Sequence, residues 1–379
     1  MVRPLTVFSF DYPPNDGGIS RLCAAIVEGL SRRGVAVSVL AQAAGDASER
    51  PAPPRVPEVR LGPGRPRREI QAWRLLRRER LDCPVLCGLW YPEGLITVAA
   101  GVKRAAILAH GSELLAPREV WRAGWWRTAQ RRVLQGATLV VANSEFTRRL
   151  VLEVAPEAHV AAVPLAVDHR RFSPGDRHRA RARFGVQGKL VVGTVARLNE
   201  YKGHDVVFKA LAALEPSWRE RLVYLVAGQG PAENALRCKA NEAGVAHLVR
   251  WLGYVPEADL PELYRAMDLF VLCTRENRCG REVEGFGLVF LEAQACGVPV
   301  VGARTGGIPE AVREGEGGWL ISQDDAGALV AILRALVKDP ASFRQAGLAA
   351  RHRIERDCTW EHYLDRFTSA LASAGIDLG

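Results

Sequence analysis

Two glutamates separated by seven residues flank a glycine-rich segment that opens a predicted helix. Glu284 precedes residues 285–288 (Gly-Phe-Gly-Leu), and Glu292 follows about two helical turns later. Because Gly285 and Gly287 lack side chains, a ligand can approach the backbone there, and the N–H groups at the positive end of a helix bind anions. A carboxylate two turns along the helix can accept the two hydroxyls of a ribose. The segment therefore predicts a site for a ligand that combines phosphate with sugar.

A pair of basic residues follows another apolar run. Residues 189–196 predict a strand, Arg197 comes directly after it, and Lys202 lies five residues later, where the next helix is expected to begin. When a nucleoside diphosphate leaves, negative charge develops on its oxygen, and two fixed cations in a water-poor site stabilise that charge. Taken alone, an Arg and a Lys at a strand end are more often surface charges. In this context we interpret the pair as a clamp for a diphosphate.

Two further segments place polar chemistry after strands in the first half of the chain. Gly17 and Gly18 lie between the strand predicted at residues 5–10 and a helix, so this glycine pair can approach a phosphate or a sugar. His110 follows the strand predicted at residues 105–109. A lone histidine usually has a structural role, and only its position after a strand makes His110 a candidate for ligand binding.

Together these segments resemble the retaining glycosyltransferases of family four, a large family that includes bacterial phosphatidylinositol mannosyltransferases and sucrose synthases. The spacing of the two glutamates is similar to the family's Glu-x7-Glu motif. The runs Gly-Val-Pro-Val (residues 297–300) and Gly-Gly-Ile-Pro-Glu (residues 306–310) stand in register with it. The resemblance covers nearly the whole chain and is most specific over residues 190–312. It implies a GT-B fold and a nucleotide-sugar donor that is bound without a metal ion or other cofactor.

The resemblance also implies roles for individual residues. Glu284 is expected to contact the transferred sugar and Glu292 the ribose, while Arg197 and Lys202 bind the donor phosphates. His110 is expected to contact the donor sugar or a phosphate. The predicted catalytic residues are therefore His110, Arg197, Lys202 and Glu284. The predicted donor-binding residues are Gly17, Gly18, Gly285, Phe286, Gly287, Leu288 and Glu292, and no residue is assigned to a metal.

Two segments depart from the family pattern. The domain junction, where the family often has Pro-Asn-Gly-Val-Asp, reads Pro-Leu-Ala-Val-Asp in this chain (residues 164–168), so it lacks the asparagine and the glycine. The segment before Glu284 is longer and more charged than the common family form. Its arginines are expected to reach either a substrate or solvent, and they are Arg275, Arg278 and Arg281.

The implied reaction is transfer of a hexosyl group from a nucleotide diphosphate sugar to a hydroxyl, with retention of the anomeric configuration. GDP-mannose is the favoured donor because residues 282–300 resemble bacterial mannosyltransferases, and a UDP-hexose is the next choice. The acceptor is expected to be a glycan, a lipid-linked molecule or a small molecule. A nucleotide-sugar epimerase of the same fold is the alternative. A dinucleotide-dependent oxidoreductase is disfavoured because no Gly-x-Gly-x-x-Gly turn follows the first strand, and no motif indicates nucleic-acid binding.

Short apolar runs alternate with amphipathic stretches of helix length along the whole chain, a pattern typical of repeated βα units. The pattern occurs twice, which predicts an α/β protein with two Rossmann-like, doubly wound parallel-sheet domains that face each other across a cleft. We expect an N-terminal acceptor domain over residues 1–172 and a C-terminal donor domain over residues 173–358. The spacing of residues 359–374 predicts a last helix, which in GT-B proteins crosses back to the first domain. The Pro-rich residues 43–68 are expected to form a mobile surface loop.

The composition is that of an ordinary globular protein. Of the 379 residues, 48% are hydrophobic and 25% charged, which argues against disorder and fibrous repeats. The eight cysteines lack the spacing of a metal site or a disulfide framework. No apolar run of membrane-spanning length and no N-terminal leader is evident, so we expect a cytoplasmic protein.

The basic charge is concentrated in the first half of the chain. Residues 1–170 contain 24 Lys and Arg against 16 Asp and Glu, whereas the net charge of the whole chain is +9. Tryptophans and arginines are interspersed over residues 117–135. This pattern indicates either peripheral contact with an anionic membrane or tryptophans that pack on the sheet beside solvated arginines.

Overall fold

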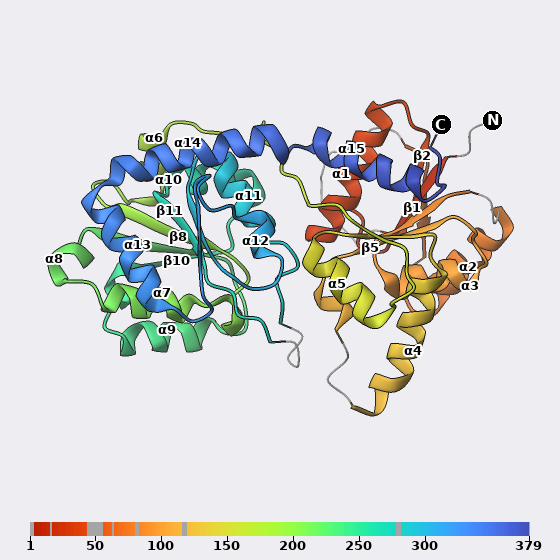
Figure 1. Cartoon of the computed structure of the whole chain (residues 1–379), viewed down its shortest axis with the longest axis horizontal. Helices are drawn as coiled ribbons and strands as arrows, with labels where there is room; N and C mark the ends of the chain where they lie inside the picture. The colour runs from red at the N-terminus through yellow and green to blue at the C-terminus, as the bar shows by residue number, and fades with distance from the viewer. Residues whose placement is uncertain are drawn as a thin grey trace. The chain divides into compact units, whose positions relative to one another are not determined.

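The computed structural model describes residues 4–15, 17–43, 56–62, 64–79, 83–115, 120–277 and 282–378. The chain divides into two compact units, coloured along the chain in Figure 1. Unit 1 comprises Met1–Pro164 and Trp360–Gly379, and unit 2 comprises Leu165–Thr359.

Unit 1 is built on a sheet of seven parallel strands in the order β3-β2-β1-β4-β5-β6-β7. Strands β4, β5 and β6 are buried at every residue, which explains why their sequences are continuous apolar runs. The strands are β1 (Leu5–Ser9), β2 (Val37–Gln42), β3 (Glu58–Leu61), β4 (Val85–Cys87), β5 (Ala105–Ala109), β6 (Leu139–Ala142) and β7 (Val160–Ala162). The helices are α1 (Gly18–Arg32), α2 (Arg67–Glu79), α3 (Leu95–Ala99), α4 (Val120–Gly136), α5 (Glu145–Val154) and α15 (Trp360–Ser373).

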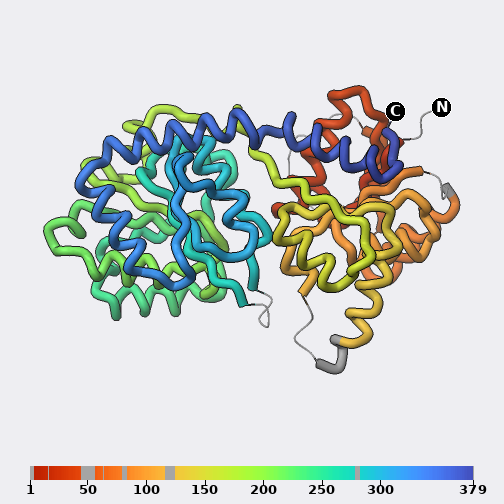
Figure 2. The backbone as a smooth tube through the Cα atoms, in the orientation of Figure 1, coloured from red at the N-terminus to blue at the C-terminus, as the bar shows by residue number. Residues whose placement is uncertain are grey.

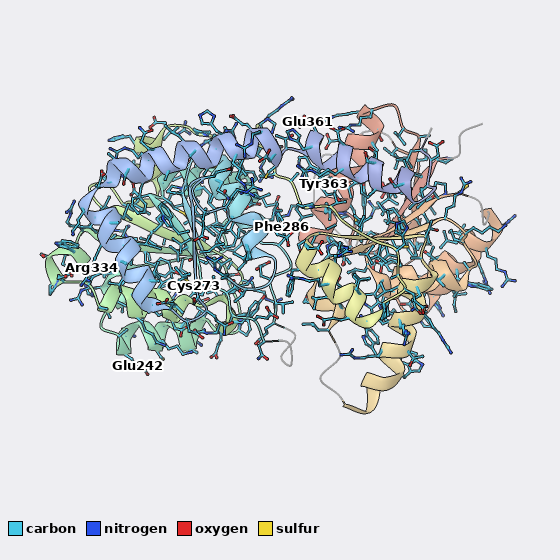
Figure 3. All side chains as sticks on the ribbon, in the orientation of Figure 1. Glu242, Cys273, Phe286, Arg334, Glu361 and Tyr363 are labelled. Atoms are coloured by element: carbon cyan, nitrogen blue, oxygen red, sulfur yellow. The ribbon has the colours of Figure 1, made fainter. Side chains whose placement is uncertain are left out.

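Helix α15 packs against α1, from the opposite end of the chain, as Figure 2 shows. A Cβ atom on Gly29 would lie 2.4 Å from Cδ1 of Leu364, so the glycine lets the two helices approach closely. At the end of α1, Arg33 donates a hydrogen bond to the carbonyl of Glu361 (3.0 Å) and lies 2.7 Å from the carboxylate of Asp365. The apolar face of α15 is buried, and it consists of Tyr363 (labelled in Figure 3), Leu364, Phe367 and Leu371.

The structure corrects the expectation of a mobile loop over residues 43–68. Strand β3 lies within this segment and pairs in parallel with β2, and α2 begins at Arg67. Residues 44–55 and 63 lie outside the described part of the chain. The sequence of β3 is Glu-Val-Arg-Leu, and its first three residues are exposed. Because an edge strand needs little apolar surface, this strand carries no clear apolar pattern.

Unit 2 is built on a second parallel sheet, in which six strands have the order β10-β9-β8-β11-β12-β13. The strands are β8 (Leu190–Val195), β9 (Leu222–Ala227), β10 (Val249–Gly253), β11 (Leu269–Leu272), β12 (Val300–Ala303) and β13 (Gly318–Ile321). The helices are α6 (Arg177–Phe184), α7 (His204–Ala212), α8 (Pro216–Arg219), α9 (Glu233–Glu242), α10 (Leu260–Ala266), α11 (Leu288–Ala295), α12 (Ile308–Ala311), α13 (Ala326–Lys338) and α14 (Pro340–Asp357).

Helix α6 is an element that the sequence did not predict, because its segment is rich in arginine and poor in apolar residues. The Asp176 side chain caps its first turn by accepting a hydrogen bond from the N–H of Arg179. Two other arginines hold the helix on unit 2 through the buried Asp268. Arg177 Nη2 lies 2.7 Å from one carboxylate oxygen, and Arg181 Nη2 lies 2.5 Å from the other. Ion pairs thus replace the missing apolar face.

None of the helices in the described residues combines the length and the apolar character needed to cross a bilayer. Seven of the cysteines lie in the described part of the chain as free thiols, and five of these are buried. Cys279 lies outside the described residues.

Candidate functional site

In the six-stranded sheet of unit 2, the order in which the chain adds strands reverses between β8 and β11, which makes this position the switch point of the sheet. Along the chain, β8 is followed by β9 and β10 on one side, and β11, β12 and β13 then lie on the other side. In open parallel sheets, ligands bind beyond the carboxyl ends of the strands at such a point. Arg197 and Lys202 follow β8, and Glu284 follows β11. Three of the predicted site residues therefore come from the two loops that meet at this edge.

Lys202 and Glu284 form an ion pair at this point. The Nζ atom of Lys202 lies 2.6 Å from Oε2 of Glu284, and the two side chains are only 12% and 19% exposed. Burial alone would lower the pKa of Lys202, but the Glu284 carboxylate and Tyr201 together hold that pKa above its ordinary value. Lys202 therefore remains a cation at neutral pH. A fixed ammonium and a fixed carboxylate, groups suited to a phosphate and a sugar hydroxyl, stand side by side.

The backbone of Glu284 is held by the glycine pair that follows β12. The N–H of Gly307 donates a hydrogen bond to the carbonyl of Glu284 (2.9 Å). Gly306 has a φ of 55°, and a Cβ atom at this position would lie 2.3 Å from the same carbonyl oxygen. A larger residue would therefore displace Glu284. This close approach gives a physical reason for the Gly-Gly-Ile-Pro-Glu run.

Helix α11 begins at Leu288, four residues after Glu284, and Gly287 occupies its N-cap position. Gly287 adopts a left-handed conformation (φ 92°, ψ 61°), and among the described residues no side chain caps the first turn. A Cβ atom on Gly287 would lie 2.7 Å from the ring of Phe290. Phe286, labelled in Figure 3, is 2% exposed and anchors the segment in the core. The glycine-rich segment therefore leads directly into the helix, with Leu288 as its first residue.

Glu292 lies on the same helix and is 4% exposed. Its Oε2 atom accepts a hydrogen bond from the hydroxyl of Tyr264 on α10, at 2.7 Å. The carboxylate is thus fixed by a side chain 28 residues earlier in the sequence. The two predicted acidic residues are held by different partners, Glu284 by Lys202 and Glu292 by Tyr264.

Arg197 has a fixed backbone and an exposed side chain. The neighbouring Leu198 donates a hydrogen bond to the carbonyl of Gln229 (3.0 Å). A Cβ atom on Gly228 would lie 1.9 Å from the carbonyl oxygen of Ala196. Glycine is therefore required where the loop after β9 packs on the loop after β8. Within the described part of the chain, Arg197 makes no ion pair, so the structure brings Lys202 and Glu284 together but joins Arg197 to neither.

Arg275 is bound within the protein, which the sequence did not predict. Its guanidinium makes a bidentate contact with Asp205 (2.8 Å to each carboxylate oxygen) and lies 2.6 Å from Asp324. These hydrogen bonds raise the pKa of Arg275. Two acidic residues far along the sequence therefore bind the guanidinium, whereas the sequence suggested only a contact with a substrate or solvent. Arg278 and Arg281 lie outside the described residues.

The sheet of unit 1 has the same kind of switch point, between β1 and β4. Gly17 and Gly18 lie in the loop after β1, where α1 begins at Gly18. Gly17 has a φ of 150°, and a Cβ atom on either glycine would meet no atom of the described residues within 4 Å. At these two positions the described residues therefore leave the start of α1 open on the side where a Cβ atom would project.

His110 follows β5 and is held by three hydrogen bonds. Its Nε2 atom lies 2.9 Å from the carbonyl of Gly88, so this nitrogen must be the donor, and in a neutral ring Nδ1 is then an acceptor. Its backbone N–H donates to Glu113 (2.6 Å), and its carbonyl accepts from Asn143 (3.1 Å). The ring is oriented by the fold, which is compatible with either a structural or a ligand-binding role.

A buried glutamate that the sequence analysis overlooked lies at the β1–β4 switch point. Glu93 is 1% exposed and accepts a hydrogen bond from the N–H of Phe10 (2.9 Å). The carbonyl of Phe10 accepts from the side chain of Asn15 (2.9 Å), whose own carbonyl accepts from the hydroxyl of Ser20 (2.5 Å). This chain of hydrogen bonds runs from Glu93 to the first turn of α1. A single acidic residue within the apolar residues 84–100 is the sequence signal that could have revealed it.

Replacing Glu93 by glutamine is expected to change how stability depends on pH. Burial raises the pKa of Glu93 from 4.5 to about 7. The folded state therefore binds an extra proton between these two values, so its stability falls as the pH rises through them. Glu93→Gln cannot ionise and should match the wild type near pH 4 but be more stable at pH 8, by about 3 kcal/mol. Urea unfolding of both proteins at the two pH values measures this. If the two proteins differed in free energy of unfolding by the same amount at pH 4 and at pH 8, the prediction would be contradicted.

Comparison with known proteins gives two family matches and several similar sequences. Residues 16–171 match the model described as Glycosyltransferase Family 4, and residues 176–353 match Glycosyl transferases group 1. A GDP-mannose-dependent alpha-(1-6)-phosphatidylinositol monomannoside mannosyltransferase of Mycolicibacterium smegmatis is 34% identical over 70% of this chain and 69% of its own length. The protein of the same description from Mycobacterium tuberculosis is 30% identical over 95% of this chain and 96% of its own. A D-inositol 3-phosphate glycosyltransferase of Actinosynnema mirum is 37% identical over 65% of this chain and 58% of its own.

Two solved structures show the same fold along nearly the whole chain. Sucrose-phosphate synthase from Thermosynechococcus elongatus has a TM-score of 0.80 and 20% identity, and the match covers 98% of each chain. HepE from Anabaena, in complex with UDP, has a TM-score of 0.78 and 19% identity, with coverage of 98% of this chain and 100% of that one.

Proposed function

The chain belongs to glycosyltransferase family 4 and is a retaining hexosyltransferase with the GT-B fold, and from this premise we propose that it transfers mannose from GDP-mannose to an acceptor hydroxyl. A UDP-hexose is the second choice of donor. Two of the similar sequences are described as GDP-mannose-dependent, and their described acceptors, like that of the Actinosynnema protein, contain inositol. We therefore assign to this chain an inositol-containing acceptor, either lipid-linked or small. These sequences are described as transferases, so the epimerase alternative has no support.

The observation that carries this proposal is the largely buried ion pair between Lys202 and Glu284 at the switch point of unit 2. Lys202 supplies a permanent cation for the donor diphosphate. The start of α11, which no side chain of the described residues caps, supplies backbone N–H groups from Phe286, Gly287 and Leu288 to the same anion. Arg197, exposed at the end of β8, provides a second cation.

The reaction that fits these groups is substitution on the same face of the sugar. The bond between the anomeric carbon and the phosphate oxygen breaks, and a bond to the acceptor oxygen forms. The proton of the acceptor hydroxyl passes to the departing phosphate. Lys202 and Arg197 stabilise the charge that develops on that phosphate, and Glu284 holds the sugar. Glu292 holds the ribose.

The roles proposed for the residues of unit 1 rest on the family resemblance. His110 is assigned to the donor sugar or a phosphate, and Gly17 and Gly18 to a phosphate or the transferred sugar of the donor. The oriented ring of His110 and the open backbone at Gly17 and Gly18 are consistent with these roles.

Peripheral contact with an anionic membrane is a further part of the proposal. On α4, Trp125 is 67% exposed beside exposed arginines, whereas Trp126 packs against Trp90 and Tyr91 with ring centroids 4.7 Å and 4.8 Å apart. Of these two tryptophans, Trp125 is available to a lipid surface, whereas Trp126 packs against the protein. Flotation with anionic vesicles tests the contact, and its absence would argue against it.

Binding and transfer assays test the proposed donor. A ligand that binds only the native state raises the melting temperature, so GDP should raise it more than UDP at equal concentration. Radiolabelled GDP-mannose should then transfer its mannose to a phosphatidylinositol or inositol phosphate acceptor. If no nucleoside diphosphate raises the melting temperature, the proposal is wrong. If UDP stabilises more than GDP, the donor assignment changes to a UDP-hexose.

A further inference from the structure

Tyr264 joins the core of unit 2 to an acidic side chain of the candidate site. It lies on α10 and is fully buried, and its hydroxyl donates a hydrogen bond to Oε2 of Glu292 at 2.7 Å. A carboxylate accepts hydrogen bonds only, so the phenol is the donor in this pair. One oxygen of Glu292 is thereby tied to a residue on a different helix.

The ring of Tyr264 is held firmly by its neighbours. Its centroid lies 6.0 Å from that of Phe172 and 5.9 Å from that of Phe270, both in edge-on or tilted contacts. Phe270 in turn packs against Phe290 of α11, at 5.4 Å. A phenol with two side-chain torsions, packed on several sides, presents its hydroxyl in one direction.

Glu292 stands among buried neighbours on α11. Phe290, Leu291, Ala293 and Gln294 are all fully buried. A carboxylate in such surroundings is costly unless hydrogen bonds compensate for its lost hydration, and a charged acceptor strengthens each of these bonds. The bond from Tyr264 therefore both stabilises the carboxylate and selects its orientation.

We propose that Tyr264 is a positioning residue that orients Glu292 toward the ribose hydroxyls of the nucleotide. The inference rests on the proposed function, in which Glu292 accepts those hydroxyls. Tyr264 does not touch the nucleotide. It acts through the carboxylate, so its contribution depends on the presence of the ribose hydroxyls.

A comparison of two nucleotides isolates this contribution. The dissociation constants of GDP and 2′,3′-dideoxy-GDP are measured by calorimetry for the wild type and for Tyr264→Phe. The wild type should bind GDP at least tenfold more tightly than the dideoxy compound. Tyr264→Phe should weaken GDP about tenfold and leave the dideoxy compound nearly unchanged, because a hydrogen bond to a charged group is removed. A merely structural role would weaken both ligands equally, which would overturn the proposal.

Tyr224→Phe is the matched control. Tyr224 is another fully buried tyrosine of unit 2, and its hydroxyl is bonded to Thr194 (2.7 Å) and His204 (2.9 Å) rather than to Glu292. Its loss should lower the melting temperature without changing the ratio of the two dissociation constants. If Tyr224→Phe and Tyr264→Phe reduced the preference for GDP over the dideoxy compound equally, the proposal would also be overturned.

A second variant covers the case in which Tyr264→Phe does not fold. With p-aminophenylalanine at position 264, the ring and a weaker N–H donor are kept, so the ratio should be intermediate between those of the wild type and the phenylalanine variant. If the phenylalanine variant folds, a preference for GDP over the dideoxy compound that is weaker in the p-aminophenylalanine variant than in the phenylalanine variant would count against the proposal. If the phenylalanine variant does not fold, a p-aminophenylalanine variant with the same preference as the wild type would count against it.

The wild-type measurements separate this inference from the proposed function. If the wild type binds GDP but does not prefer it to the dideoxy compound, the ribose role of Glu292 and the role of Tyr264 are both wrong, while donor binding stands. If the wild type binds neither GDP nor UDP, the proposed function is wrong and the inference with it.

Discussion

Replacing Lys202 by methionine should lower kcat for sugar transfer by about 10²- to 10³-fold, because the charge that stabilises the leaving diphosphate is lost. Methionine keeps most of the side-chain volume but removes the ion pair of Glu284, so the melting temperature should also fall, and kcat is measured at a temperature where both proteins are folded. The expected loss depends on the buried position of the ammonium, 2.6 Å from Glu284, where water screens its field poorly. Steady-state kinetics with saturating donor and acceptor measures the effect.

Lys209→Met is the control for this experiment. Lys209 lies on α7 in the same unit, is 65% exposed and pairs with Asp205 at 3.6 Å. Removing this charge should leave kcat within a factor of about two, since an exposed ion pair contributes little. Arg197→Ala should lower kcat in the same direction as Lys202→Met. Full activity in both the Lys202 and the Arg197 variants would refute the diphosphate assignment.

Gly203→Ala, in the loop after β8, should cause a large loss of stability. Gly203 has a φ of 74°, and a Cβ atom there would lie 1.9 Å from the carbonyl oxygen of Cys273, the residue after β11 that Figure 3 labels. Neither atom belongs to a flexible side chain, so one of the two loops must move. We expect a loss of about 3 kcal/mol or more, roughly 6–12 °C in melting temperature for a unit of this size.

Gly244→Ala separates the steric effect from the backbone effect. Gly244 has a similar φ of 68°, but a Cβ atom there would meet no described atom within 4 Å. This variant should lose only about 1 kcal/mol, the cost of a left-handed alanine. Equal melting temperatures for the two variants would show that the Cys273 carbonyl does not restrict position 203. Because Lys202 precedes Gly203, the Gly203 variant should also lose activity.

Much of the fold could be predicted from the sequence because buried parallel strands consist of continuous apolar residues. The predicted run at residues 105–109 coincides with β5, and the run at residues 5–10 agrees with β1 to within one residue. The elements that were missed are held by other forces. β3 depends on backbone pairing with β2 at the sheet edge, and α6 depends on the ion pairs of Asp268. Neither interaction leaves a periodic pattern in the sequence.

The site could be predicted as a set of residues but not as a set of contacts. The Glu-x7-Glu motif indicated Glu284 and Glu292, yet the partner of each lies far away in sequence, 82 residues for Lys202 and 28 for Tyr264. Arg275 shows the reverse case, since a conspicuous arginine beside the motif is neutralised by Asp205 and Asp324. Such pairings arise from the sheet topology, which brings the ends of non-adjacent segments together.

The packing of α15 on α1 also bears on how the protein is made. Unit 2 is one uninterrupted stretch of chain, whereas unit 1 needs Trp360–Gly379, which the ribosome synthesises after all of unit 2. Until the end of translation the surface around Gly29 is therefore without Leu364 and its neighbours, although all seven strands of the first sheet have already been made. Although N-terminal domains usually mature first, the later unit of this protein is expected to complete its folding before the earlier one.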